Sequence, residues 1–257
     1  MIGSVLYLNR IIMALVLAAI VAGCVIYLDW TWLPKYWPLL VEGLWRTIWL
    51  LLLSSAIGFI LALGLGWAQA YGPTFLASPA RVFCTVIRGT PLLVQLWFIY
   101  YGFGTLLSQM PEIRQSDLWP ILRQAWPYAL LALTLSFAGY EGEVMRGAFA
   151  SVPKGQTEAA RSMGMPGFTL FRRIHLPLAI QGVLPTLAGE TILQLKATPL
   201  VATVTMVELY AVASRVRQET LIVYEPLLLL AVIYLGLAGV IVTLFAWLER
   251  RSPLRRT

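Results

Sequence analysis

The chain has 257 residues, of which 59% are hydrophobic and 12% are charged. A soluble globular domain carries about 25% charged residues, so this composition excludes an ordinary soluble domain. The formal net charge of +7 does not indicate nucleic-acid binding, because the basic residues are scattered among short loops and one tail. Cys24 and Cys84 lie in or beside apolar stretches and make neither a disulfide framework nor a metal site.

Apolar runs recur along the chain, and several approach the ~20 residues needed to cross a ~30 Å hydrocarbon core. They predict an all-α polytopic membrane protein with about six transmembrane helices. The expected spans are Ile11–Leu28, Thr47–Gln69, Val82–Leu107, Trp126–Arg146, Leu176–Lys196 and Ile222–Leu248.

The first span allows two interpretations. Arg10, followed by an apolar run that ends Val21-Ala22-Gly23-Cys24, is similar to a bacterial lipoprotein signal with its cleavage site. A chain with several spans needs no lipid anchor, and small residues before a cysteine are common in membrane helices. We therefore favour an uncleaved first helix.

Basic residues set the expected orientation in the membrane. With the N-terminus in the cytoplasm, inner segments hold about twice as many basic residues as outer ones, and the opposite orientation inverts this ratio. Both termini are therefore expected in the cytoplasm. The tryptophans on the outer side form an interfacial belt: Trp30, Trp32, Trp37, Trp45, Trp119 and Trp126.

Three parts of the chain follow from this orientation. Residues 1–46 hold the first helix and an external amphipathic segment, within which Trp30–Trp45 is expected as a short interfacial helix. Residues 47–251 form the membrane domain, with a cytoplasmic loop at 147–175. Residues 252–257 are a basic cytoplasmic tail.

The loop between the fourth and fifth spans has the character of a docking element. Pro153 and Gly155 mark a turn before a short helix that starts near Gln156, and Gly164 ends that helix in a tight turn. An amphipathic helix follows, with three apolar side chains on one face: Phe168, Phe171 and Ile174. Within the first helix, small alanines allow a partner backbone to approach, and Glu158 offers one charge for an ion pair. Composition alone leaves an ordinary interfacial loop equally open.

The spacing within this loop resembles the cytoplasmic signature of permease subunits of bacterial ABC importers. It reads Glu158-Ala159-Ala160, three residues, Gly164, nine residues, then Ile174-His175-Leu176-Pro177. Two further stretches resemble the branch of that family that takes up polar amino acids, of the histidine, arginine, glutamine and opine type. They are Arg88–Leu96, which continues to Tyr100-Tyr101-Gly102, and Val152–Gln156. The resemblance covers roughly Thr47–Arg251.

This resemblance implies a type I ABC importer permease fold, with a five-helix core preceded by an N-terminal helix. It implies that two permease subunits, identical or homologous, pair in the bacterial inner membrane around a central pathway. Two ATPase subunits, which bind ATP and Mg, would dock at the loop, where Glu158, Ala159, Ala160 and Gly164 are the expected coupling residues. A periplasmic binding protein would deliver the substrate, and this chain would bind no cofactor of its own. Membrane lipid is the remaining expected partner.

Two departures from the family pattern bear on the substrate. The family usually has Lys-Asp-Thr-Ser-Leu after the fifth span, whereas this chain has Lys196-Ala197-Thr198-Pro199-Leu200. It also has Gly189-Glu190 where Asn-Glu is common. The first change removes a carboxylate and inserts a proline at a place expected to face the pathway.

Polar side chains inside the spans are the candidates for the substrate pathway. Thr186, Glu190 and Gln194 follow one another at four-residue steps on the fifth span and form one polar stripe. An ionisable residue at a helix centre costs at least ~2.5 kcal/mol, so it faces a cavity or a partner. We expect this stripe to line the pathway, and an interhelical hydrogen-bond seam is the alternative. A carboxylate at Glu190 favours a cationic substrate, such as a basic amino acid or an opine-like compound.

The fourth span adds one candidate and one expected ion pair. Ser136, Tyr140 and Glu143 share a face, and we include Tyr140 among the pathway residues. Glu143 precedes Arg146 by three residues, a spacing that predicts an ion pair. Arg88 is interpreted as a boundary or packing charge and His175 as an interfacial residue.

Other activities find little support in the residues. The chain has no Gly-x-x-x-x-Gly-Lys-Ser/Thr phosphate loop, so it cannot be the ATPase. It also has no expected catalytic or metal-binding residues, since one histidine excludes multi-histidine zinc sites. The alternatives are a permease for another small polar solute, an intramembrane lipid-processing enzyme that would use Glu141, Glu143 and His175, or a receptor or scaffold. The last two leave the docking loop unexplained.

Overall fold

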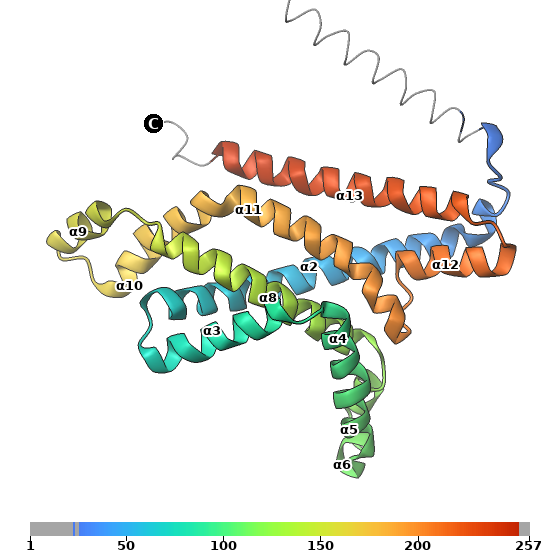
Figure 1. Ribbon diagram of the computed structural model, residues 1–257, viewed down its shortest axis with the longest axis horizontal. Coiled ribbons are helices and arrows are strands. Elements are labelled where there is room, and N and C mark those ends of the chain that lie inside the picture. The colour runs from blue at the N-terminus through green and yellow to red at the C-terminus, as the bar shows by residue number, and fades with distance from the viewer. Residues whose placement is uncertain (1–22, 24–25, 252–257) are drawn as a thin grey trace, which may run out of the picture.

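The computed structural model describes residue 23 and residues 26–251, and all regular structure within them is helical. The long elements lie side by side, with α9 and α10 at one end of the bundle and α12 at the other (Figure 1). The predicted all-α fold is confirmed. In chain order the elements are α2 (Leu33–Tyr71), α3 (Thr74–Gly89), α4 (Leu92–Trp97), η1 (Phe98–Phe103), α5 (Gly104–Gln109), α6 (Pro111–Arg114), α7 (Trp119–Leu122), α8 (Trp126–Ala150), α9 (Lys154–Ser162), α10 (Gly167–Leu170), η2 (Phe171–His175), α11 (Leu176–Ala197), η3 (Thr198–Val204), α12 (Leu209–Thr220) and α13 (Tyr224–Arg251).

Three helical stretches among the described residues are long and apolar enough to cross a membrane: Leu33–Tyr71, Gly167–Val204 and Tyr224–Arg251. The bent pair of α3 and the helix from Leu92 to Gln109 makes a fourth if it counts as one span. The helix α8 has 25 residues and is the most enclosed, with α2, α3 and α11 packed around it. The expected first span, Ile11–Leu28, and the tail 252–257 lie almost wholly outside the described residues.

The third expected span is not one straight helix. The chain bends by 105° between α3 and the helix that follows. Pro91 has no backbone N–H and restricts Thr90 to an extended conformation, with φ −116° and ψ 140°. The amide of Gln95 partly compensates at the break, because it donates to the backbone oxygens of Ile87, at 2.8 Å, and Thr90, at 3.0 Å. The expected Val82–Leu107 span is therefore a bent pair of helices, which begins earlier, at Thr74, and ends at Gln109.

The N-terminal side of α2 also differs from the expectation. Instead of a separate interfacial helix at Trp30–Trp45, one helix of 39 residues begins at Leu33 and runs to Tyr71. The expected boundary between residues 46 and 47 lies within this helix. The segment expected to be external and the second expected span therefore form one element.

Small residues let the central helices approach closely. A Cβ added at Gly66 of α2 would lie 2.6 Å from the Cβ of Met145 on α8. One added at Gly139 of α8 would lie 2.5 Å from a side-chain carbon of Ile87 on α3. In a membrane, where packing drives helix association, glycines at such contacts stabilise the bundle. The core around α8 is therefore fixed, and α13 lies along α11 at its edge (Figure 1).

Candidate functional site

A cavity of about 240 Å³ lies between α4, α8 and α11. Three of the four predicted pathway residues line it: Tyr140, Glu190 and Gln194. Thr186, the fourth, is exposed on α11 and is not part of this lining. The remaining wall is mostly apolar and consists of Leu92, Ser136, Phe137, Leu193 and Ala197.

Gln194 takes part in a helix contact as well as in the cavity wall. Its side chain is only 5% exposed, and its amide donates to the hydroxyl of Ser54 and to the backbone oxygen of Leu133, each at 2.9 Å. These bonds tie α11 to α2 and α8. Hydrogen bonds between helices were the alternative role for the polar stripe of α11, and Gln194 has that role. The stripe therefore holds one carboxylate in the cavity wall, Glu190, and one amide that joins helices, Gln194.

A positive charge lies beside the cavity, opposite in sign to Glu190. The guanidinium carbon of Arg88 is 5.9 Å from the ring centroid of Tyr140, which forms part of the lining. Arg88 is also near enough to Glu190 to attract it electrostatically. Sequence reasoning treated Arg88 as a packing charge. The cavity wall therefore holds a carboxylate and an aromatic ring, and a guanidinium lies near both of them outside the lining.

Glu141 is a buried acid that the sequence suggested only for the enzyme alternative and not for the substrate pathway. Its side chain is 0% exposed, and neither of its carboxylate oxygens has a hydrogen-bond partner among the described residues. It is near enough to Glu190 for the two carboxyls to repel each other when charged. The only signal in the sequence was a second acid within α8, two residues before Glu143.

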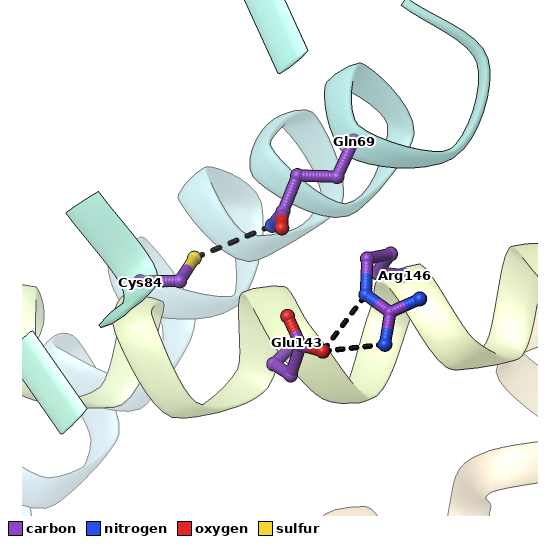
Figure 2. Close-up of polar contacts among 4 residues, drawn as sticks. All are labelled: Gln69, Cys84, Glu143 and Arg146. Atoms are coloured by element: carbon purple, nitrogen blue, oxygen red, sulfur yellow. Dashed lines mark hydrogen bonds and ion pairs between the residues drawn. The ribbon is translucent and has the colours of Figure 1, made fainter. Parts of the chain in front are cut away.

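Glu143 and Arg146 form the predicted ion pair. The Nε of Arg146 donates to Glu143 Oε1 at 2.8 Å, and Nη2 of the same arginine bonds to the same oxygen. Figure 2 shows this pair beside the contact of Gln69 Nε2 with Cys84 Sγ, at 3.4 Å, between α2 and α3. Glu143 is therefore engaged in a structural pair.

The acids and the histidine that an intramembrane enzyme would need do not form a joint site. Glu143 is held by Arg146, and Glu141 is sealed inside the bundle. His175 contacts Thr157, with 3.1 Å between Nε2 and the hydroxyl oxygen. Among the described residues, no group of three or more His, Cys, Asp or Glu side chains could hold a metal ion.

The loop between α8 and α11 folds as two short helical pieces at one end of the bundle (Figure 1). On α9, Glu158 and Ala159 are exposed, whereas Ala160 is 3% exposed and packs inward. Gly164 has φ +74°, the left-handed conformation that favours glycine, which agrees with the predicted tight turn. Its N–H donates to the oxygen of Arg161 at 2.9 Å. The loop therefore presents α9 outward on a defined turn.

Comparison with known proteins agrees with this arrangement. Residues 54–252 match the family described as binding-protein-dependent transport system inner membrane component. The octopine transport system permease protein OccM of Rhizobium meliloti is 41% identical over 222 residues, covering 84% of this chain and 89% of that protein. The histidine/lysine/arginine/ornithine transport system permease protein HisM of Escherichia coli K12 is 36% identical over 227 residues, covering 85% and 94%.

Solved structures show the same fold. An amino acid ABC transporter crystallised with histidines matches with a TM-score of 0.72 at 30% identity, covering 87% of this chain and 99% of that chain. The MetNI methionine ABC transporter in an inward-facing conformation matches in fold, with a TM-score of 0.67 at 20% identity, covering 84% and 97%. The chain is thus a transport subunit and not an enzyme. It belongs to the family of binding-protein-dependent transport system inner membrane components, the permease subunits of ABC importers.

Proposed function

We propose that this permease subunit binds a cationic amino acid or an opine in the cavity between α4, α8 and α11 during import. The single observation that carries the proposal is the position of Glu190 in the wall of that cavity. The names of the relatives support the substrate class, since they include octopine, nopaline and basic amino acid permeases.

The charges around the cavity fit such a substrate. An acid inside a membrane is costly unless it has a partner, and a cationic group of the substrate would supply one for Glu190. Amino acids and opines also carry carboxylates, which the nearby guanidinium of Arg88 can attract. The ring of Tyr140, 41% exposed, forms part of the cavity wall and lies beneath the Arg88 guanidinium. Thr186, which lies outside this lining, would meet the substrate only elsewhere along the pathway.

We further propose that the exposed face of α9 docks on the ATPase. Glu158 and Ala159 would contact that partner, Ala160 would hold the helix against the loop, and Gly164 would set the turn. The complete importer would contain two permease subunits, identical or homologous, and two ATPase subunits that bind ATP and Mg. A periplasmic binding protein would dock at the opposite end, with both termini of this chain in the cytoplasm and lipid around the bundle.

The test is the Glu190→Gln variant in the assembled complex. This change removes the charge and keeps the shape and hydrogen-bonding capacity. A hydrogen bond to a charged group is worth roughly 1.5–3 kcal/mol, so affinity for the substrate during uptake should fall by about ten- to a hundredfold. Affinity of the binding protein should not change, because its site is on another chain.

Ser54→Ala is the control. It removes the hydroxyl that accepts from Gln194 and that lies outside the cavity lining, so it should lower assembly and thermal stability, with uptake falling in proportion to folded complex. Uptake per assembled complex separates the two effects. Normal affinity in Glu190→Gln would remove this residue from the site.

A further inference from the structure

His175 lies at the junction between the loop and the spanning helices. It is the last residue of η2 and is 8% exposed. Its Nε2 lies 3.1 Å from the hydroxyl oxygen of Thr157 on α9. Its ring stacks on that of Tyr71, with centroids 4.9 Å apart and planes at 29°. One side chain, directly before α11 in the chain, therefore contacts both α9 and the end of α2.

Tyr71, on which His175 stacks, belongs to a packed aromatic cluster with Phe149 and Phe171. The hydroxyl of Tyr71 donates to the backbone oxygen of Phe149, near the end of α8, at 2.6 Å. The ring of Phe149 lies 6.0 Å from that of Tyr71 and 5.8 Å from that of Phe171, measured between centroids. The ends of α2 and α8 and the start of α11 are thus joined, and a displacement of His175 would act on all three.

On the other side of His175, the helix α9 is less tightly packed than this cluster. The helix α9 packs mainly against α10 and η2, and a groove of about 530 Å³ lies between the loop and the ends of α2 and α8. Thr157, Glu158 and His175 all line that groove. Where a helix borders a groove, fewer apolar contacts hold it, and a single oriented hydrogen bond has more weight. Thr157 is also adjacent to Glu158, on the surface proposed to meet the ATPase.

We propose that His175 is a positioning residue that transmits movement of α9 to the spanning helices, through its contact with Thr157 and its stack on Tyr71. This inference rests on the proposed docking of α9 on the ATPase. Interactions of this kind hold one rigid element to another, so that a rotation of the first moves the second.

The test compares Thr157→Val with Thr157→Ser in the complete reconstituted importer. Valine keeps the shape of the side chain and removes the hydroxyl, whereas serine keeps the hydroxyl. The measured quantity is the number of substrate molecules imported per ATP hydrolysed. One hydrogen bond corresponds to about a fivefold effect, so Thr157→Val should lower this ratio about fivefold and Thr157→Ser should preserve it.

His175→Phe provides the second arm, since it keeps a ring against Tyr71 and loses the bond to Thr157. It should lower the ratio as Thr157→Val does, and the double variant should be no worse than either single one, because both remove the same contact. A double variant with the product of the two effects would overturn the proposal. So would equal ratios in Thr157→Val and Thr157→Ser, or a Thr157→Val subunit that fails to assemble while Thr157→Ser assembles.

Glu158→Lys distinguishes this inference from the function on which it rests. If Glu158→Lys uncouples ATP hydrolysis from uptake and Thr157→Val does not, the docking role of α9 stands and the role of His175 is wrong. If neither variant uncouples transport, the docking role itself is wrong.

Discussion

Two glutamates, Glu208 and Glu141, are both 0% exposed and yet have opposite surroundings. Glu208 precedes α12, where its carboxylate accepts from the N–H groups of Tyr210, at 2.9 Å, and Ala211, at 2.8 Å. Hydroxyls of Thr47 on α2 and Tyr234 on α13 lie 3.4 and 3.5 Å from it. Glu141, in the middle of α8, has no hydrogen-bond partner among the described residues.

The difference separates a carboxylate that stabilises the bundle from a buried carboxylate that has no partner among the described residues. Burial raises the pKa of Glu208, and its hydrogen bonds, chiefly those from Tyr210 and Ala211, act in the opposite direction. That carboxyl joins three helices at the end of the bundle remote from α9 (Figure 1). A buried polar group without a partner costs about 1–3 kcal/mol, so Glu141 weakens the packing of α8 where it faces the neighbouring helices. We infer that Glu208 stabilises the end of the bundle remote from α9, whereas Glu141 adds no stability to the packing of α8.

The largest effect is expected for Glu208→Ala. The change leaves the partly buried N–H groups of Tyr210 and Ala211 without their acceptor and removes the helix cap, at a cost of about 3 kcal/mol. Thermal unfolding of the purified complex measures this loss. Glu219→Ala is the control on the same helix. The side chain of Glu219 is 39% exposed, so water can replace it as the partner of Tyr36 and Arg215, and this change should cost much less. Equal losses in the two variants would contradict the stabilising role of Glu208.

A smaller effect, on coupling and not on stability, is expected for changes in the loop at α9. Glu158 there is an exposed carboxylate, in contrast to the two buried ones. Glu158→Lys should leave thermal stability unchanged and lower ATP-coupled uptake, since the residue lies on an exposed face of α9. Gly164→Asp should lower ATP-coupled uptake further than Glu158→Lys does. A residue with a Cβ at φ +74° costs about 1 kcal/mol or more and would distort the turn. Uptake and ATP hydrolysis, both measured per assembled complex, give the result. Normal coupling in both variants would rule out a role for this loop.

The smallest effect is expected for Glu141→Met. Methionine fills a similar volume without a polar group, so thermal stability should stay the same or rise by about 1 kcal/mol. Uptake per complex should be retained. A stable Glu141→Met complex that no longer transports would show that the unsatisfied acid acts in transport, and the comparison with Glu208 would then have to be revised.

The sequence predicted those features that depend on local pattern. The spacing from Glu158 to Pro177 identified the loop, and the three-residue interval predicted the pair of Glu143 and Arg146. The position of Glu190 within a long apolar run predicted its place at a cavity. These signals are read within one helix or one loop, so they need no knowledge of how the helices pack.

Features that depend on packing were missed or misplaced. Each four-residue step along a helix advances by about 40°, so Thr186 drifts away from the face that Gln194 presents to α2 and α8. The burial of Glu141 depends on three neighbouring helices. The bend at Pro91 has a signal in the sequence, the proline itself, but the apolar run continues through it and resembles one span.

The central claim, that the cavity at Glu190 receives the substrate, is tested most directly by protection of a cysteine within it. Leu193 is 57% exposed and lines the cavity, whereas Thr186, on the same helix, lies outside that lining. In an assembled complex shown to import arginine, arginine should slow the labelling of Leu193→Cys by a thiol reagent and leave Thr186→Cys unchanged. The protection should disappear when Glu190→Gln is added. Labelling of Leu193→Cys at the same rate with and without arginine would contradict the account.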